Sequence, residues 1–196
     1  HILARRQRQM CIRDSLRCIP NMVICTPSDE NETRKLLTTA YLHNGPASVR
    51  YPRGTGPNSK VDKDLKPLKI GEANIINEES SEIIILNFGT LLNEANQISK
   101  ELKATLVDMR FVKPLDEKLL RKLFKKAKVF ISIEDGSIMG GAGSAVQEFA
   151  SKENLNVRSI LFGIPDKFIE HASREEMLVE AGLDVENIKS KLSKLL

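Results

Sequence analysis

Apolar residues beyond position 70 follow a regular pattern, in which short apolar runs alternate with segments whose apolar positions recur every three or four residues. The short runs have the length and β-branched content of buried strands. They predict strands at 72–77, 83–88, 105–109, 129–133 and 157–162. The recurring segments predict helices around 91–102, 119–127, 138–149, 177–181 and 185–195. Because this alternation favours parallel pairing, residues 70–196 are expected to form an α/β domain with a mainly parallel five-stranded sheet.

A smaller strand–helix–strand unit comes before this domain. Residues 22–26 and 47–51 have the composition of strands. Between them, Asp29 and Glu32 form the pattern of a capping box at a helix start. The unit is too small to fold alone. The stretch 55–69 that follows it is rich in Gly, Pro and charge without periodicity, which predicts a linker.

The first 15 residues have no alternating or helical apolar pattern. We expect residues 1–15 to be an artefactual or disordered tail, since they have no apolar face to offset the entropy of ordering. Four arginines and one aspartate place +3 of the net charge of +4 in this tail, which leaves +1 for the rest of the chain. Without a basic stripe, or an apolar run of roughly 20 residues, nucleic-acid and membrane partners are not expected.

Cysteine and histidine residues point to no metal or redox site. Cys11, Cys18 and Cys25 are seven residues apart, a spacing that matches no zinc or disulfide motif. The three histidines are scattered along the chain. We therefore expect no metal ligands and a reducing compartment.

A glycine-rich turn at 135–144 separates a predicted strand from a helix. Such turns can bind phosphate at a helix N-terminus. This one lacks the third glycine of the dinucleotide motif, where Val146 stands, and the Lys-Ser/Thr of a P-loop. The favoured interpretation is structural: the glycines allow the helix to pack closely against the sheet or another subunit. A non-catalytic binding module that uses this turn is the alternative.

The stretch 49–54 offers one candidate anion-binding residue. Arg50 and Arg53 flank a Tyr-Pro pair at the carboxyl end of a predicted strand, where α/β sheets bind ligands. Arg53 lies just past the strand, and its guanidinium suits a phosphate or carboxylate. A surface salt bridge is the alternative interpretation.

The stretch 107–116 is interpreted as structural. Asp108 and Arg110 follow a predicted strand, and Asp116 is expected to cap the next helix. No Ser-His-Asp, Cys-His or paired-carboxylate arrangement can be assembled from adjacent elements. The residues by themselves therefore indicate no catalytic site.

Several motifs together resemble the 1-deoxy-D-xylulose-5-phosphate synthases of the transketolase family. The resemblance runs in order from about Leu16 to the last residue. Its motifs are TPSDENE (26–32), VRYPRG (49–54), LNFGTL (86–91), VDMRFVKPLDE (107–117), MGGAGS (139–144) and FGIPDKFIEH (162–171). The DMR and KPLD elements are shared with transketolases and 2-oxoacid dehydrogenase subunits, so a fragment of either is the alternative within enzymes.

This resemblance implies a transferase that depends on thiamine diphosphate and Mg²⁺ and condenses pyruvate with glyceraldehyde 3-phosphate, with loss of CO₂. It implies a role in isoprenoid, thiamine and pyridoxal precursor biosynthesis, a homodimer, and a location in the bacterial cytoplasm or the plastid stroma. Residues 16–54 would end a pyrimidine-binding domain, and 70–196 would be the transketolase C-terminal domain.

The same resemblance places most of the functional residues outside this chain. The family's catalytic, cofactor and metal ligands lie upstream of residue 16, so the isolated chain is expected to be inactive and to bind neither cofactor. Arg53 alone carries over, as the residue that binds the substrate phosphate.

Overall fold

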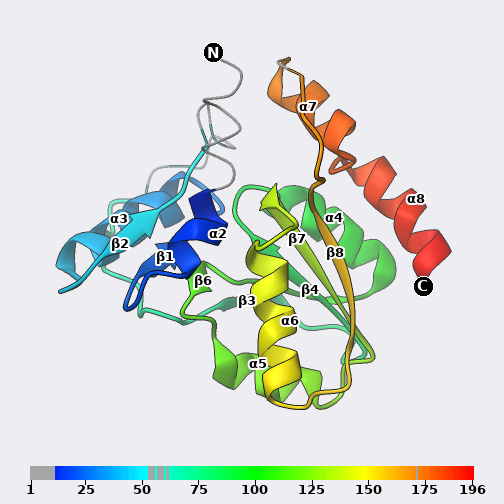
Figure 1. Ribbon diagram of the computed structural model, residues 1–196, viewed down its shortest axis with the longest axis horizontal. Coiled ribbons are helices and arrows are strands. Elements are labelled where there is room, and N and C mark those ends of the chain that lie inside the picture. Colours follow the sequence, from blue (N-terminus) through cyan, green and yellow to red (C-terminus); the bar gives the residue numbers. More distant parts are fainter. Residues whose placement is uncertain (1–11, 53–55, 57–59, 61, 171) are drawn as a thin grey trace.

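The computed structural model describes residues 12–52, 56, 60, 62–170 and 172–196, which form two α/β units that share a core (Figure 1). The N-terminal unit contains α2 (Ile12–Arg17), β1 (Val23–Cys25), α3 (Glu30–Leu42) and β2 (Ala47–Val49). Strands β1 and β2 pair in parallel, as a strand–helix–strand unit requires. Asp29 accepts a hydrogen bond from the backbone N–H of Glu32 at 2.7 Å, which confirms the predicted start of α3. Helix α2 begins within the segment where no helix is expected from the sequence; the tail before it lies outside the described residues.

The N-terminal unit is completed by a strand from much later in the chain. Strand β6 (Phe111–Lys113) pairs antiparallel with β1, which gives a three-stranded sheet of order β2-β1-β6. The sequence analysis missed β6, because three residues before a proline show no alternation that would mark a strand. This pairing explains how a unit too small to fold alone is stabilised by the rest of the chain.

The five-stranded sheet confirms the predicted α/β domain. Its strands are β3 (Asn74–Asn77), β4 (Ile83–Phe88), β5 (Thr105–Asp108), β7 (Val129–Ser137) and β8 (Arg158–Ile164). Their order is β3-β5-β4-β7-β8, and every neighbouring pair is parallel except β3–β5. The sheet is therefore mainly parallel, with one antiparallel edge strand.

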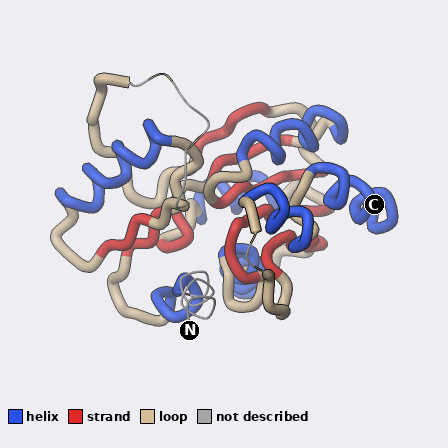
Figure 2. Tube along the Cα trace, turned by 90° about the horizontal axis from the view of Figure 1, so that it is seen from above, coloured by secondary structure: helices blue, strands red, loops and turns tan. Residues whose placement is uncertain are grey.

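Helices cover both faces of this sheet (Figure 2). They are α4 (Leu92–Leu102), α5 (Glu117–Phe124), α6 (Ala142–Lys152), α7 (Arg174–Ala181) and α8 (Val185–Leu195). Apolar residues of α5 and α6 pack with Leu86 on one face, and those of α4 and α8 pack with Ile85 on the other. Successive residues of β4 thus point to opposite cores, as the pleat requires.

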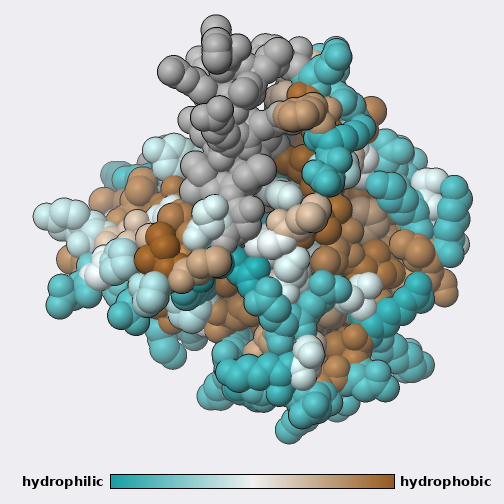
Figure 3. Space-filling view, viewed as in Figure 1, coloured by the Kyte–Doolittle hydropathy of each residue, from teal (hydrophilic) through white to brown (hydrophobic). Residues whose placement is uncertain are grey.

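Apolar residues are visible over α3 and β2 and also beside β8 and α8, while charged and polar residues cover much of the rest of this face (Figure 3). At the end of α3, Tyr41 and Leu42 are exposed. Among the described residues, no helix has the length and apolar content that a bilayer crossing would need.

Candidate functional site

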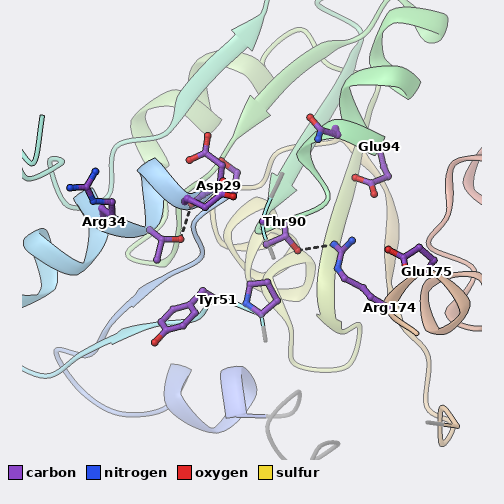
Figure 4. Close-up of a pocket in the computed structure, with 13 residues that line it drawn as sticks. Asp29, Arg34, Tyr51, Thr90, Glu94, Arg174 and Glu175 are labelled. Atoms are coloured by element: carbon purple, nitrogen blue, oxygen red, sulfur yellow. Dashed lines mark hydrogen bonds between the residues drawn. The ribbon is translucent and has the colours of Figure 1, made fainter. Parts of the chain in front are cut away.

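A cavity of about 420 Å³ lies between the N-terminal unit and the five-stranded sheet, where helices α3, α4 and α7 begin (Figure 4). Its lining residues come from segments that follow strands β1, β2, β4 and β8. They are Ser28, Asp29, Glu30, Thr33, Arg34, Tyr51, Pro52, Gly56, Thr90, Asn93, Glu94, Arg174 and Glu175. The cavity therefore occupies the edge of the fold at which α/β sheets bind ligands.

The stretch that the sequence analysis singled out borders this cavity. Tyr51, Pro52 and Gly56 line it. Arg53, the one candidate site residue, lies outside the described residues. Its role therefore stays a prediction, and Pro52 and Gly56 are the nearest described residues that line the cavity.

Two arginines of the cavity were missed by the sequence analysis. Arg174, the first residue of α7, donates a hydrogen bond to the hydroxyl of Thr90 at 3.2 Å, and Figure 4 shows it reaching across from α7. Arg34 of α3 donates to the backbone carbonyl of Asp62 at 2.5 Å. No local motif marks either residue, since only the packing of their helices brings them to the cavity.

An ion pair joins the residue that follows β2 to β7. The guanidinium of Arg50 contacts Asp135 twice: Nη1 lies 2.5 Å from Oδ1, and Nη2 donates to the backbone carbonyl at 2.8 Å. The other carboxylate oxygen of Asp135 accepts from the Thr90 hydroxyl at 3.0 Å. Arg50, which was given no role from the sequence, therefore holds the two units together next to the cavity.

The glycine-rich turn is filled by a carboxylate of the chain itself. Glu134 is buried, and its two oxygens accept from the backbone N–H groups of Ala142 and Gly143 at 3.0 and 2.9 Å. A Cβ atom at Gly141 would lie 2.1 Å from the carbonyl oxygen of Ser137. The N–H groups of Ala142 and Gly143, the first two residues of α6, are thus already satisfied by Glu134, which supports the structural interpretation of this turn over a phosphate site.

Asp108 is a buried acid at the junction of the two units. Its oxygens accept from the hydroxyl of Ser28 at 2.7 Å and from the amide of Asn87 at 3.3 Å. Burial raises the pKa of Asp108 to about 7, against these two hydrogen bonds, which lower it. Close by, Arg110 pairs with Glu32 of α3 at 2.7 Å. Asp108 is the last residue of β5 and Arg110 comes two residues later, and both serve the contact between the units.

The free energy of unfolding is expected to depend on pH through the titration of Asp108. Between pH about 4 and about 7 the folded state keeps this proton and the unfolded state has lost it, so the contribution of Asp108 to stability falls as the pH rises. Asp108→Asn removes the titration and keeps the hydrogen-bonding shape. In urea unfolding, the free energy of wild type minus that of the variant should fall from pH 4.5 to 7.5. Exposed Asp166→Asn is the control, and a flat difference for Asp108→Asn would contradict the assignment.

Among the described residues, no group of three or more His, Cys, Asp or Glu side chains could hold a metal ion. Burial also raises the pKa of the Cys25 thiol to about 12, so this cysteine is protonated at neutral pH and unsuited to nucleophilic work.

Two protein-family models match the chain. "Transketolase, C-terminal domain" matches residues 71–188, and "Transketolase, pyrimidine binding domain" matches residues 5–58. The first contains the five-stranded sheet, and the second contains β1, α3 and β2. The cavity therefore lies between segments that belong to the two matched domains.

Among characterised proteins, the chain is similar to 1-deoxy-D-xylulose-5-phosphate synthases of Pseudomonas. It is 51% identical over 175 residues to the protein from Pseudomonas fluorescens (strain Pf0-1) and 52% identical over 174 residues to that from Pseudomonas aeruginosa (strain UCBPP-PA14). Each match covers 89% of this chain and 28% of the relative. The chain thus spans just over a quarter of the length of these relatives.

Solved transketolase structures share the fold. A chain described as "Split gene transketolase, inactive beta4 tetramer" superposes with a TM-score of 0.79 at 25% identity, covering 92% of this chain and 59% of that one. The transketolase of Campylobacter jejuni superposes with a TM-score of 0.61 at 17% identity, covering 92% of this chain and 27% of that one. Since the C-terminal domain model alone matches more than half of the residues, this chain belongs to the transketolase family.

Proposed function

We propose that this chain is the C-terminal part of a 1-deoxy-D-xylulose-5-phosphate synthase, which condenses pyruvate with glyceraldehyde 3-phosphate and releases CO₂. The observation that carries the proposal is the identity of about half of all positions to synthases, over nine-tenths of the chain. The transketolase structures share only 25% and 17% of positions. This difference favours a synthase over a transketolase.

The proposal divides the chain into functional parts. Residues 16–54 are the last part of the pyrimidine-binding domain, residues 55–69 are the linker, and residues 70–196 form the C-terminal domain. The two matched ranges, 5–58 and 71–188, support a boundary between two domains within residues 55–70, and the first range begins before residue 16. The catalytic residues belong to the part of the longer protein that precedes this segment, so the isolated chain is inactive.

Arg53 binds the phosphate of glyceraldehyde 3-phosphate in this proposal. The support is the position of its neighbours, because Pro52 before it and Gly56 after it both line the cavity between the two matched domains. A planar guanidinium can hold two oxygens of a phosphate dianion at once. Pyruvate has no phosphate, so Arg53 serves the acceptor substrate alone.

Cofactor binding and assembly complete the proposal. The full-length enzyme binds thiamine diphosphate and Mg²⁺ and acts as a homodimer in the bacterial cytoplasm. Thiamine diphosphate supplies carbanion stabilisation when bound. The described residues offer no metal-ligand group, so no step of the reaction is assigned to either cofactor within this chain.

The 196-residue chain is expected to show no binding of thiamine diphosphate in the presence of magnesium. Magnesium would need oxygen ligands from the protein to hold the diphosphate, and no group of three or more His, Cys, Asp or Glu side chains that could hold a metal ion is found among the described residues. Isothermal titration calorimetry of the chain with both components should give only heats of dilution, with the full-length protein as the positive control. Micromolar binding by the 196-residue chain would contradict the proposal that the cofactor-binding residues lie in the preceding part of the longer protein.

The reading frame upstream of residue 16 tests the proposed function and its competitors. A Gly-Asp-Gly cofactor motif in that frame is expected if the segment belongs to a synthase. A genuine stop codon in its place would favour a non-catalytic α/β binding module instead.

A further inference from the structure

We propose that Asp135 is a positioning residue for the acceptor substrate: it holds Arg50 and thereby fixes the cavity wall at Tyr51 and Pro52. This inference rests on the proposed function, which places the phosphate contact directly after Pro52 in the sequence. Arg50 and Asp135 act here through the wall, without touching the substrate themselves.

Arg50 is tied to the sheet of its own unit through its backbone. Its backbone N–H donates to the carbonyl of Cys25 in β1 at 2.9 Å, just after β2 ends at Val49. Tyr51 is exposed, and Pro52 has no N–H to donate. Beyond Arg50, the direction of the wall segment therefore depends on contacts other than the sheet.

Asp135 supplies such a contact from the other unit. The Arg50 side chain reaches both a carboxylate oxygen and the backbone carbonyl of Asp135, at 2.5 and 2.8 Å. The two side chains are only 22% and 13% exposed. A two-point, charge-assisted contact in a largely buried place fixes the orientation of a guanidinium as well as its distance.

The carboxylate of Asp135 is itself held in place. Thr90 donates to its second oxygen at 3.0 Å, and a Cβ atom at Gly89 would lie 3.0 Å from its first oxygen. Gly89, with φ +103°, therefore allows the backbone before α4 to pass close to the carboxylate. Thr90 also accepts a hydrogen bond from Arg174. Hydrogen bonds therefore connect Arg50, through Asp135 and Thr90, to Arg174 on the opposite wall of the cavity.

This network gives a reason for the wall to keep its position relative to α4 and α7. Only two residues, Tyr51 and Pro52, lie between Arg50 and Arg53 in the sequence, so even a fully extended chain spans no more than about 10 Å from Arg50 to Arg53. A displacement of Arg50 is therefore expected to displace Tyr51 and Pro52, which line the cavity. A shift of about 1 Å in a substrate-positioning group can change rates by up to about 100-fold.

The test uses the full-length enzyme that carries this segment. Asp135→Asn removes the charge while keeping the shape, and is expected to raise KM for glyceraldehyde 3-phosphate about tenfold. KM for pyruvate and kcat should change less than twofold. Asp135→Glu keeps the charge one methylene further out and should recover part of the loss.

Glu148→Gln is the matched control. Arg17, the last residue of α2, pairs with Glu148 of α6 at 2.5 Å, so this variant also breaks an arginine–carboxylate contact between the two units, away from the cavity. It should leave both KM values unchanged. Equal rises in KM for Glu148→Gln and Asp135→Asn would mean that general loosening of the units is responsible, which overturns the positioning role.

A double variant separates this inference from the proposed function. If Asp135 acts through the Arg53 segment, Asp135→Asn should add no further rise in KM for glyceraldehyde 3-phosphate in an Arg53→Ala background. Independent, multiplying effects would overturn the positioning role and leave the phosphate assignment intact. No effect of Arg53→Ala by itself would instead refute the phosphate assignment in the proposed function.

Discussion

Replacing Gly141 by alanine is expected to lower the free energy of unfolding by about 3 kcal/mol. A Cβ atom at this position would lie 2.1 Å from the carbonyl oxygen of Ser137 and 2.6 Å from a carboxylate oxygen of Glu134. The carbonyl belongs to the backbone, so relief requires a shift at the start of α6. Such a shift pulls Ala142 and Gly143 away from Glu134 and leaves a buried carboxylate short of donors.

Urea unfolding of the 196-residue chain measures this effect. Gly141→Val should be worse than Gly141→Ala, because valine adds two methyl groups in the same space. Gly45→Ala is the matched control: Gly45 is exposed, and the nearest atom to a new Cβ belongs to the side chain of His43, which can move away. If Gly141→Ala keeps its stability and loses affinity for a nucleotide, the turn is a binding site and the structural interpretation is wrong.

In the full-length enzyme, Arg53→Ala is expected to lower kcat/KM for glyceraldehyde 3-phosphate by roughly 10- to 150-fold. A hydrogen bond to a charged group contributes about 1.5–3 kcal/mol, and about 1.4 kcal/mol corresponds to a factor of ten. KM for pyruvate should change little, since pyruvate carries no phosphate. Steady-state kinetics with each substrate varied in turn gives both values.

Two further variants sharpen this experiment. Arg53→Lys should recover only part of the loss, because an ammonium keeps the charge and loses the two-pronged geometry. Arg121→Ala removes an arginine that pairs with Glu117 and Glu153 and does not line the cavity, so it should leave the kinetics unchanged. Equal losses for both substrates in Arg53→Ala would show that Arg53 supports the fold.

Helices and strands that are long enough to show a regular spacing of apolar residues could be predicted from the sequence. The five strands of the larger sheet and the helices between them were recognised, because each buries one face or both against a core. The caps at Asp29 and Asp116 were also recognised, since a helix start depends on neighbours within three residues.

Contacts between distant segments could not be predicted. Strand β6 forms through its hydrogen bonds with β1. A segment of three residues is too short to show a periodic apolar pattern. Arg50 and Asp135 are 85 residues apart, and no local sequence pattern around either residue indicates its partner. Glu134 could not be recognised as the partner of the glycine-rich turn, because a buried acid in a strand has no local signature of what it binds.

The most direct test of the proposed function is a product assay of the full-length protein to which this segment belongs. With pyruvate, glyceraldehyde 3-phosphate, thiamine diphosphate and magnesium, we expect 1-deoxy-D-xylulose 5-phosphate and one CO₂ per turnover. Transfer of a two-carbon unit from a ketose phosphate to an aldose phosphate, without release of CO₂, would contradict the synthase assignment and favour a transketolase.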